Sequence, residues 1–574
     1  MTLVPAAVPF RPCRRAGALA LVCALGLAAG CGRTTGAGAL DGGATSGPAW
    51  FEDVASARGL QFRYQSGHQG RYLLPEIMGG GGALFDMDGD GDLDVYLVQG
   101  GSVTTPDQKG TGNRLFRNDG AGTFVDVTDA SHAAAPGYGM GVTTGDYDND
   151  GDVDLYVTNI GPNVLLQNDG RGVFTDVTGK AGVGGLGWST SAAFFDADAD
   201  GDLDLFVLKY INWSPKSELE CFSLTGVPDY CSPRNYDAPM ADVLYRNNGD
   251  GTFSDVSGEA GLHAAFGNGL GIVVADFSGD GRPDVFVAND AMPNQLWLNQ
   301  GGRFRDVALI AGVAVDQDGA PKSGMGVDAV DVDHDGDRDL LVVNLDGEAD
   351  SFYRNDKALF TDDTVQVGLR GPSRRFTRFG TALIDFDNDG QLDLYEANGR
   401  VGQQAELFSD DPFAEPNLLF KGTASGRFEE VSPRGGTARS AAHTSRAAIF
   451  GDIDNDGGID ILVVNRDAPP YLLHNVVAKR GHWALIRVVD EHGRDAYGAQ
   501  VATTVGSARV LRDVKAAYSY LASNDPRVHI GLGAQTSLPD VTVRWVDGTE
   551  ERFGDLPADR VTTLKKGGGR PVSP

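Results

Sequence analysis

The sequence predicts an all-β protein, a seven-bladed β-propeller followed by a small C-terminal β-domain. An Asp-rich loop recurs seven times along the chain, and each copy leads directly into a strand-like run such as VYLV, LYVTN or LLVVN. Neighbouring copies begin 50 to 80 residues apart. Repeats of this length, with about four strands each, are typical of propeller blades.

The first 31 residues are predicted to be an export signal rather than part of the fold. Three arginines precede an apolar run, Ala16–Ala29, which is too short to span a bilayer and ends in small residues. The run closes as LAAGC and resembles the lipobox of bacterial lipoproteins, in which Cys31 would receive the lipid. An ordinary signal peptide, cut near Gly30 and leaving a free thiol, is the alternative.

The rest of the chain divides into four predicted parts. Residues 32–48 are mostly Gly, Ala, Ser and Thr, which predicts a flexible tether. Residues 49–476 contain the repeats of the propeller, and residues 477–567 read as a β-domain with alternating strands. Residues 568–574 are expected to form a disordered tail.

Only two cysteines, Cys221 and Cys231, fall in the predicted folded part. They lie in CFSLTGVPDYC, within the longest gap between repeats, where we expect an insertion. A second insertion is expected around residues 399–416. An oxidising compartment would let the two cysteines pair and would stabilise the first insertion. Two unpaired thiols are the alternative.

Each Asp-rich loop carries side-chain oxygens at positions one, three, five and nine, and glycine at position six. Glycine permits a sharp turn with positive φ, so that alternating oxygens point at one centre, where the carbonyl at position seven can join them. This pattern predicts up to seven structural Ca²⁺ ions. The predicted site residues, at positions one, three, five, seven and nine, are Asp86, Asp88, Asp90, Asp92 and Asp94; Asp146, Asp148, Asp150, Asp152 and Asp154; Asp196, Asp198, Asp200, Asp202 and Asp204; Asp276, Ser278, Asp280, Arg282 and Asp284; Asp331, Asp333, Asp335, Asp337 and Asp339; Asp385, Asp387, Asp389, Gln391 and Asp393; and Asp452, Asp454, Asp456, Gly458 and Asp460.

Charge favours calcium over the alternative of a solvated acidic turn. Carboxylates about 4 Å apart repel by about 1 kcal/mol per pair in water and by about 4 kcal/mol at an intermediate effective dielectric constant. These loop positions hold 31 aspartates and the formal net charge is -31, so the loops account for nearly all of the excess acidity. The loop with Ser278 and Arg282 is expected to bind calcium least well. An acidic chain also argues against a nucleic-acid partner.

The residues after each loop argue against an EF-hand. An EF-hand requires flanking helices and a bidentate Glu at position twelve, whereas six of the seven loops have Leu or Val there and all lead into strands. Glu396, the seventh case, is predicted to be a polar strand residue and not a ligand. The loops are therefore expected to have a structural role.

A further motif, FxDV or a variant, predicts how the ring closes. It occurs seven times, but the first copy, Phe51–Val54, precedes the first loop, and none follows YLLHN at Tyr471–Asn475. We therefore expect Phe51–Val54 to form the outer strand of the last blade.

These motifs resemble the FG-GAP or VCBS repeats of integrin-like propellers. The run YLLPEIMGGGGALFDMDGDGDLD, from Tyr72, is similar to the first blade of the cartilage acidic protein-like family. WALIRVV from Trp483, YSYLASNDPRVHIGLG from Tyr518 and VTVRWVDGTEERF from Val541 resemble the ASPIC/UnbV domain that follows the propeller in that family. The turn Ala522–Asn524 departs from the Ser-Gln-like turn of relatives, which puts a shared role of that turn in doubt.

By analogy, the resemblance implies an exported calcium-binding protein for binding, adhesion or scaffolding, at the cell envelope or outside the cell. Its expected partner is an unidentified protein or glycan, and its expected membrane attachment is the N-terminal lipid alone. A hydrolase or lyase with an active site in the central channel is the alternative, and a purely structural surface protein is a third possibility. The sequence contains no GxSxG, HExxH or paired CxxC motif, so we expect no enzymatic activity. His443, beside Arg446, is expected to be structural.

Overall fold

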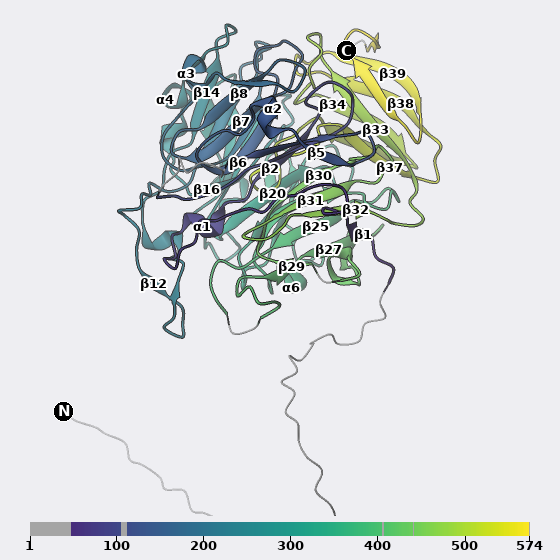
Figure 1. Cartoon of the computed structure of the whole chain (residues 1–574). Helices are drawn as coiled ribbons and strands as arrows, with labels where there is room; N and C mark the ends of the chain where they lie inside the picture. Colours follow the sequence, from purple (N-terminus) through teal and green to yellow (C-terminus); the bar gives the residue numbers. More distant parts are fainter. Residues whose placement is uncertain (1–46, 105–111, 405–406, 440, 573–574) are drawn as a thin grey trace, which may run out of the picture. The chain divides into compact units, whose positions relative to one another are not determined.

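The computed structural model describes residues 47–572 except 105–111, 405–406 and 440, and most of its regular elements are β-strands (Figure 1). The predicted export signal, Cys31 and nearly all of the predicted tether lie outside the described residues. Within the described part, no helix is long and apolar enough to cross a membrane.

Seven antiparallel sheets follow one another along the chain, and each contains one Asp-rich loop. From the inner to the outer strand, the sheets are β2 (Gly82–Phe85), β3 (Asp94–Leu97), β4 (Arg114–Asn118) and β5 (Phe124–Asp126); β6 (Tyr138–Gly145), β7 (Asp154–Ile160), β8 (Val164–Asn168) and β9 (Phe174–Asp176); β10 (Ser189–Phe195), β11 (Asp204–Lys209), β14 (Val243–Asn247) and β15 (Phe253–Asp255); β16 (Gly269–Ala275), β17 (Asp284–Asn289), β18 (Gln295–Asn299) and β19 (Phe304–Asp306); β20 (Gly324–Val330), β21 (Asp339–Asn344), β22 (Ser351–Asp356) and β23 (Leu359–Asp362); β24 (Arg378–Ile384), β25 (Asp393–Asn398), β27 (Leu418–Gly422) and β28 (Phe428–Glu430); and β30 (Ser445–Gly451), β31 (Asp460–Asn465), β32 (Tyr471–Asn475) and β1 (Phe51–Asp53).

The seven sheets close into a ring. The innermost strand of each sheet contacts the innermost strand of the next, and β30 of the seventh sheet contacts β2 of the first. Strand β1 pairs with β32, with Phe51 opposite Asn475, so the N-terminal strand completes the seventh blade. The predicted seven-bladed β-propeller is confirmed.

All seven Asp-rich loops connect the first and second strands of a blade, so they lie on one face of the ring, here called the loop face. The two insertions follow the second strands of the third and sixth blades and therefore lie on the opposite face. One contains the hairpin of β12 (Cys221–Phe222) and β13 (Pro228–Asp229), and the other contains β26 (Glu415–Pro416), which pairs with β29 (Ala442–His443). Short helices occupy the connections: α1 (Pro75–Met78), α2 (Thr128–Ser131), α3 (Thr178–Ala181), α4 (Ser257–Ala260), α5 (Ala308–Ala311), α6 (Arg370–Ser373), and 3-10 turns at Pro233–Asn235, Leu262–Ala264 and Arg434–Gly436.

The C-terminal part forms two further sheets. They contain β33 (His482–Val489), β37 (Val528–Gly533) and β40 (Val561–Lys565) in one, and β34 (Gln500–Val505), β35 (Ala508–Asp513), β38 (Ser537–Arg544), β39 (Glu550–Pro557) and β41 (Arg570–Pro571) in the other. The expectation of a disordered tail over residues 568–574 is wrong for Arg570 and Pro571. These residues pair with the edge strand β39, and the Glu551 carboxylate accepts the N–H groups of Gly567 and Gly569.

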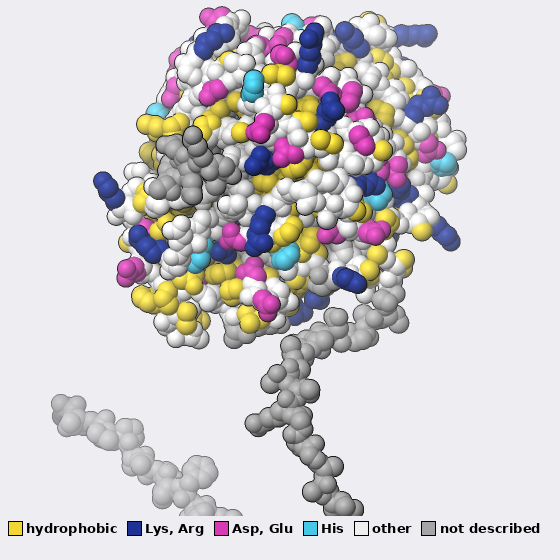
Figure 2. All heavy atoms as spheres, viewed as in Figure 1, with side chains coloured by type: hydrophobic (Ala, Val, Ile, Leu, Met, Phe, Trp, Pro, Cys, Tyr) yellow, Lys and Arg dark blue, Asp and Glu magenta, His cyan; other side chains and the backbone are white. Residues whose placement is uncertain are grey.

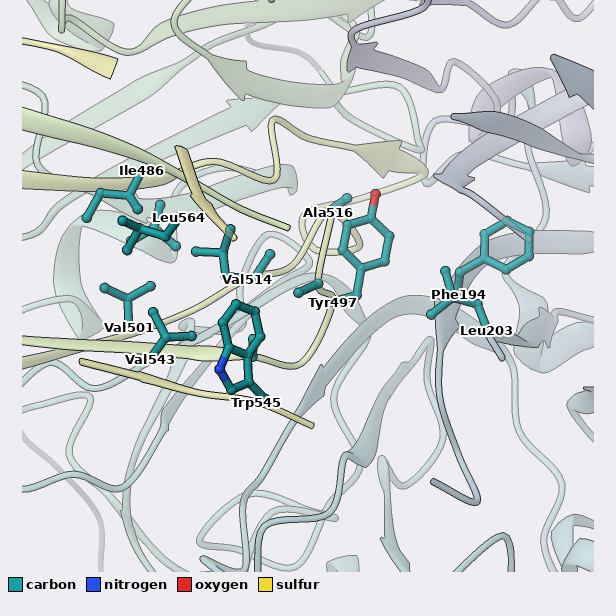
Figure 3. Packing of buried hydrophobic residues seen from close by; sticks show 14 of the residues in the cluster. Phe194, Leu203, Ile486, Tyr497, Val501, Val514, Ala516, Val543, Trp545 and Leu564 are labelled. Atoms are coloured by element: carbon teal, nitrogen blue, oxygen red, sulfur yellow. The ribbon is translucent and has the colours of Figure 1, made fainter. Parts of the chain in front are cut away.

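One apolar core joins the C-terminal sheets to the propeller. The side chains of Tyr497, Val514 and Trp545 belong to the same buried cluster as Phe194 and Leu203 of the third blade. In Figure 3 the ring of Tyr497 lies between Trp545 and Phe194. Because this cluster is shared, the C-terminal sheets and the third blade contribute to each other's burial.

The C-terminal sheets cover the loop face. Arg494, Arg512 and Arg527 each donate to a backbone carbonyl of a different Asp-rich loop, those of Gly201 (2.5 Å), Asp331 (3.3 Å) and Asp452 (2.9 Å). Charge-assisted bonds of this kind are stronger than neutral ones. The docked part therefore lies directly over the predicted metal sites.

A segment of the C-terminal part, Ala517–Asp525, enters the centre of the ring and is here called the plug. Its strand β36 (Ala522–Ser523) pairs in parallel with β2, which adds a fifth strand to the first sheet. Ser519 bridges three more blades: its N–H donates to Val327 (2.8 Å), and its hydroxyl accepts from Thr381 (3.0 Å) and donates to Ala448 (2.7 Å). Backbone N–H and C=O groups of the inner strands thus find hydrogen-bond partners in the plug.

The turn whose role was in doubt, Ala522–Asn524, belongs to the plug. Ser523 and Asn524 are fully buried. The Ser523 hydroxyl accepts the backbone N–H of Thr144 (3.2 Å), and the side-chain Oδ1 of Asn524 accepts the backbone N–H of Phe450 (3.0 Å). The plug lies at the centre of the ring, where the alternative hypothesis put an active site.

Candidate metal-binding loops

The backbone of each Asp-rich loop closes on its first aspartate. In all seven loops a carboxylate oxygen at position one accepts the N–H of the glycine at position six, for example Asp146 from Gly151 (2.8 Å). These glycines have φ between 84° and 99°, a region that other residues rarely adopt. The glycine pattern therefore has a direct conformational cause.

The aspartate at position nine fastens the loop to the third strand of its blade. In Asp154, one oxygen accepts the N–H of Tyr147 (3.1 Å) and the other accepts the N–H of Asn168 (2.8 Å). Equivalent pairs of bonds are made by Asp94, Asp204, Asp284, Asp339, Asp393 and Asp460. All seven are almost fully buried, so this residue holds the blade together besides facing the loop.

The predicted ligand oxygens converge. Groups of three ligand atoms lie within 4.8 Å of one another at Asp86, Asp88 and Asp90; Asp146, Asp148 and Asp154; Asp196, Asp198 and Asp204; Asp331, Asp333 and Asp335; and Asp454, Asp460 and His474. The structure thus brings together positions one, three, five and nine in different combinations. His474, on β32, was not predicted.

Each loop also contains a buried side-chain oxygen for which the described residues provide no hydrogen-bond partner. These are Oδ1 of Asp88, Asp148, Asp198, Asp331, Asp387 and Asp454, and Oγ of Ser278. Six of the seven are at position three. Leaving a buried acceptor unsatisfied costs about 1–3 kcal/mol, and more for a charged group. Its recurrence in every blade fits a site built for a hard cation with oxygen ligands.

Burial and mutual repulsion disfavour the charged form of the loop carboxyls. Burial raises the pKa of Asp94 and Asp385 to about 8 and that of Asp452 to about 7. Neighbouring loop carboxylates contribute to these raised pKa values, because like charges repel. A bound divalent cation would offset this repulsion.

Two of the side chains at position seven link neighbouring loops. Asp92 accepts from Asn455 (2.9 Å), which joins the first and seventh loops, and Asp202 accepts from Asn149 (2.6 Å), which joins the third and second. In other loops, Asp337 accepts the N–H of Lys357. These side chains therefore form hydrogen bonds outside the loop centre, where the ion is predicted to lie.

Arg282, included among the predicted site residues, is not placed to act as a ligand. Its guanidinium pairs with Asp280 and donates to the carbonyl of Asn299 (3.0 Å). The positive charge thereby neutralises part of the fourth loop. That loop has the fewest aspartates and carries Ser278 at position three.

A second set of structural residues escaped sequence reasoning. An asparagine at or next to the end of the third strand of a blade donates through its side chain to the position-two carbonyl of the preceding loop, at 2.7–3.0 Å. The pairs are Asn118 with Ile453, Asn168 with Met87, Asn247 with Tyr147, Asn299 with Ala197, Asn355 with Phe277, and Asn475 with Phe386. The sixth blade has Gly422 instead, where a Cβ would lie 2.0 Å from the carbonyl oxygen of Leu392.

We expect Asn475→Ala to lower the free energy of unfolding by about 2 kcal/mol, because it leaves the buried carbonyls of Phe386 and Ile459 without their donor. Urea denaturation of the calcium-loaded protein measures this. Asn248→Ala is the matched control, since Asn248 lies in an exposed turn and its loss should change stability by less than about 0.5 kcal/mol. Equal effects of both substitutions would contradict the bridging role.

Three residues that the sequence singled out outside the loops, Glu396, His443 and Arg446, lie in packed or hydrogen-bonded surroundings. Glu396 is fully buried on β25, and burial together with nearby Asp350 raises its pKa. The ring of His443 stacks on Tyr471, with centroids 5.4 Å apart. Arg446 is fully buried and donates to the backbone carbonyls of Ile77, Gly399, Arg400 and Ser445.

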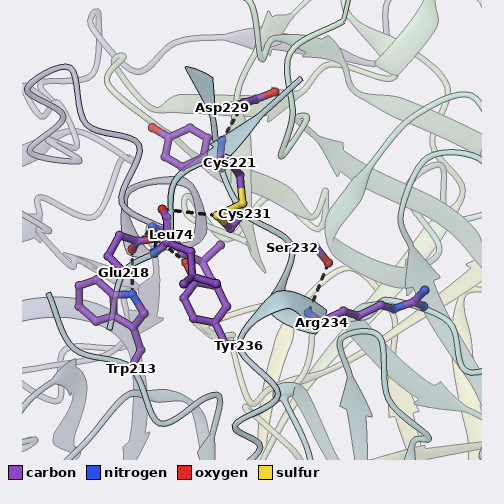
Figure 4. The surroundings of a disulfide bond; sticks show 11 residues. Leu74, Trp213, Glu218, Cys221, Asp229, Cys231, Ser232, Arg234 and Tyr236 are labelled. Atoms are coloured by element: carbon purple, nitrogen blue, oxygen red, sulfur yellow. Dashed lines mark hydrogen bonds between the residues drawn. A yellow bond between two sulfur atoms is a disulfide. The ribbon is translucent and has the colours of Figure 1, made fainter. Parts of the chain in front are cut away.

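The first insertion is fastened at its base (Figure 4). A disulfide joins Cys221 and Cys231, whose Cα atoms are 5.2 Å apart. Nearby, Glu218 accepts from the Trp213 indole (2.8 Å) and from the N–H of Leu74 (3.1 Å). The insertion is therefore tied to the segment that leads into α1.

The fold and the repeated loops together define a class of protein. A model for FG-GAP-like repeats matches residues 86–157, 146–207, 225–287, 276–342 and 331–396, about half of the chain, and a model for ASPIC and UnbV matches residues 490–571. The chain belongs to the family of FG-GAP-like repeat propellers that carry a C-terminal ASPIC and UnbV domain. The seventh loop lies outside the matched ranges but has the same geometry.

Within this class, the chain is similar to proteins named cartilage acidic protein 1. It is 28% identical over 315 residues to that of Xenopus tropicalis and 27% identical over 305 residues to that of Homo sapiens. The alignments cover 51% of this chain, and only 44% and 43% of those two relatives. The chain thus matches less than half the length of these relatives.

Solved structures give more distant likenesses. A lectin of Agrocybe aegerita that recognises non-reducing terminal N-acetylglucosamine is 15% identical, with a TM-score of 0.38 and coverage of 68% of this chain and 86% of its own. A rhamnogalacturonan lyase is also 15% identical, with a TM-score of 0.35 and coverage of 69% and 71%. Likenesses at this level say nothing about a ligand or an activity of this chain.

Proposed function

We propose that this chain is an exported propeller that binds calcium in its seven loops for structural purposes and serves as a binding or scaffold protein. The observation that supports calcium is the buried oxygen in each loop that has no hydrogen-bond partner among the described residues, together with the ligand atoms that converge in five of the loops. A structural role follows from the surroundings, because each loop is fastened to strands and lies beneath the C-terminal sheets. Calcium would fix the geometry of the blades. In sensor proteins, by contrast, calcium opens a pair of helices.

We place the ligand-binding surface on the face opposite the loops, since the C-terminal sheets cover the loop face. That face carries the disulfide-bonded hairpin, on which Phe222 is 61% exposed. It also holds a cavity of about 430 Å³ lined by Arg234, Lys322, Glu348 and Arg374. A volume of this size suits a small ligand or part of a glycan.

The proposal includes no nucleic-acid partner, because the chain is acidic, with a formal net charge of -31. On the face drawn in Figure 2, acidic and basic side chains are interspersed, without the single basic patch that phosphate backbones require. An unidentified protein or glycan is therefore the proposed partner.

The proposed location is the cell envelope or the extracellular space, supported by the signal-like N-terminus and the disulfide. Lipid attachment at Cys31 is part of this proposal. Metabolic labelling with a radioactive fatty acid tests it: the wild-type chain should be labelled and Cys31→Ser should not. Labelling of neither protein would favour the ordinary signal peptide.

A glycan and protein binding screen of the calcium-loaded mature protein tests the binding role. We expect the protein to bind one of the screened ligands saturably. The bound ligand should not be converted into a product. Hydrolase and lyase substrate panels run in parallel test the enzyme alternative. Turnover would support that alternative, and the absence of both binding and turnover would leave a purely structural protein.

A further inference from the structure

The residue just before the interblade asparagine of each third strand, or before Gly422 in the sixth blade, lies over the Asp-rich loop of the same blade. The seven residues at this position are Arg117, Gln167, Arg246, Leu298, Arg354, Lys421 and His474. Here they are called the third-strand residues. They differ in charge although they occupy equivalent places, so the seven blades provide an internal comparison.

In two blades the third-strand residue makes a direct ion pair with loop carboxylates, and in a third blade a histidine ring nitrogen lies within 4 Å of them. Lys421 pairs with Asp387 and lies 2.8 Å from Asp389. Arg354 lies 3.5 Å from Asp333 and 2.6 Å from Asp339. In the seventh blade, Nδ1 of His474 lies 3.8 Å from Asp454 and 3.0 Å from Asp460.

In two further blades the third-strand residue is an arginine that acts at longer range. Arg117 interacts electrostatically with Asp88, and Arg246 does so with Asp198. Five of the seven third-strand residues therefore face a position-three carboxylate with a basic side chain.

In the two remaining blades the third-strand residue is uncharged. In the fourth blade the loop has Ser278 in place of the position-three carboxylate, and the third-strand residue is the apolar Leu298. In the second blade Gln167 donates to Asp148 (2.5 Å) and brings no charge to a loop with five aspartates. Of the loops with a full set of aspartates, the second thus faces a neutral third-strand residue.

We propose that the third-strand residue sets the calcium affinity of its loop by competing with the ion for the position-three carboxylate. A positive charge held against that carboxylate offsets part of its attraction for calcium and repels the ion, so affinity falls as the third-strand residue becomes more closely paired. Among the loops with five aspartates, the second is then the one whose affinity its third-strand residue lowers least. The sixth loop, with four aspartates of which Lys421 engages two, is among the weakest. This inference rests on the proposed calcium function.

Equilibrium dialysis against chelator-buffered calcium tests the inference on the mature protein. We expect Lys421→Met to fill one site at a free calcium concentration about tenfold lower than in the wild type, because a charge is removed within a few ångströms of the ion. Gln167→Arg should weaken one site by about tenfold. Lys565→Met is the matched control: it makes the same chemical change at an exposed residue of β40 and should leave every site unchanged.

The outcomes separate the inference from the function on which it rests. If the wild-type protein binds no calcium, the proposed function fails. If it binds calcium but neither Lys421→Met nor Gln167→Arg changes an affinity, the third-strand residues do not tune the sites. Lys421→Arg keeps the charge and should keep the wild-type affinity, so a rise equal to that of Lys421→Met would attribute the effect to shape and overturn the inference.

Discussion

Adding EDTA to the calcium-loaded mature protein should lower its melting temperature by at least about 10 °C, and an excess of calcium should restore it. A ligand that binds only the folded state stabilises it by about 2.7 kcal/mol per site when its free concentration is one hundred times its Kd. Several occupied loops would together contribute enough to shift the transition by this amount. Differential scanning calorimetry measures the shift.

Magnesium provides the control for this experiment. It demands a smaller, near-octahedral shell and keeps several of its waters, so it should restore the melting temperature less well than calcium does. An identical melting temperature in EDTA and in calcium would contradict the structural role of the loops.

Tyr520→Ala should lower the free energy of unfolding by about 4 kcal/mol, because it removes a fully buried aromatic side chain of the plug. Tyr520 is fully buried, and its ring centroid lies 4.9 Å from that of Phe379 on the sixth blade. Its hydroxyl donates to the carbonyl of Met78 in α1 (2.8 Å). Losing a buried aromatic side chain costs about 3–5 kcal/mol, and the carbonyl is left without its donor. Urea denaturation in calcium measures the change.

Two further variants test whether the loss of stability comes from the aromatic ring of Tyr520. Tyr520→Phe removes only the hydroxyl and should cost about 1 kcal/mol. Phe222→Ala removes an exposed aromatic side chain of the hairpin and should change stability by less than about 0.5 kcal/mol. If Tyr520→Ala were as mild as Phe222→Ala, the plug would contribute little to holding the blades together.

The propeller could be predicted from the sequence because its information is local and repeated. The glycine at position six is needed for a backbone with positive φ, and the strand after each loop is evident from its β-branched and aromatic residues. Ring closure by Phe51 followed from counting motifs, and its pairing with Asn475 confirms it.

The plug could not be predicted in the same way. Ser519 and Asn524 form bonds with strands more than 70 residues away along the chain, and nothing in YSYLASND marks those partners. The departure at Ala522–Asn524 did draw attention to the segment. Its burial, and the way in which it fills the ring, depend on how the C-terminal sheets dock on the propeller.

The asparagines between blades were missed although their signal was present. Asn118, Asn168 and Asn299 recur in the NxLFxN-like motif, but the sequence shows only a turn and not the carbonyl of the preceding loop. His474 escaped notice because its contribution depends on the register of β32 against β31. Position nine was predicted only as a ligand, since one of its two backbone bonds goes to the third strand, which the loop pattern does not mark.

A direct count of bound calcium tests the central claim that the Asp-rich loops are metal sites. Native mass spectrometry of the mature protein, after exposure to calcium and removal of excess ions, should show several bound Ca²⁺ ions, up to one for each of the seven loops. Asp148→Asn should bind one ion fewer, and Glu52→Gln, an exposed substitution on β1, should bind as many as the wild type. A wild-type protein that retains no calcium would contradict the account.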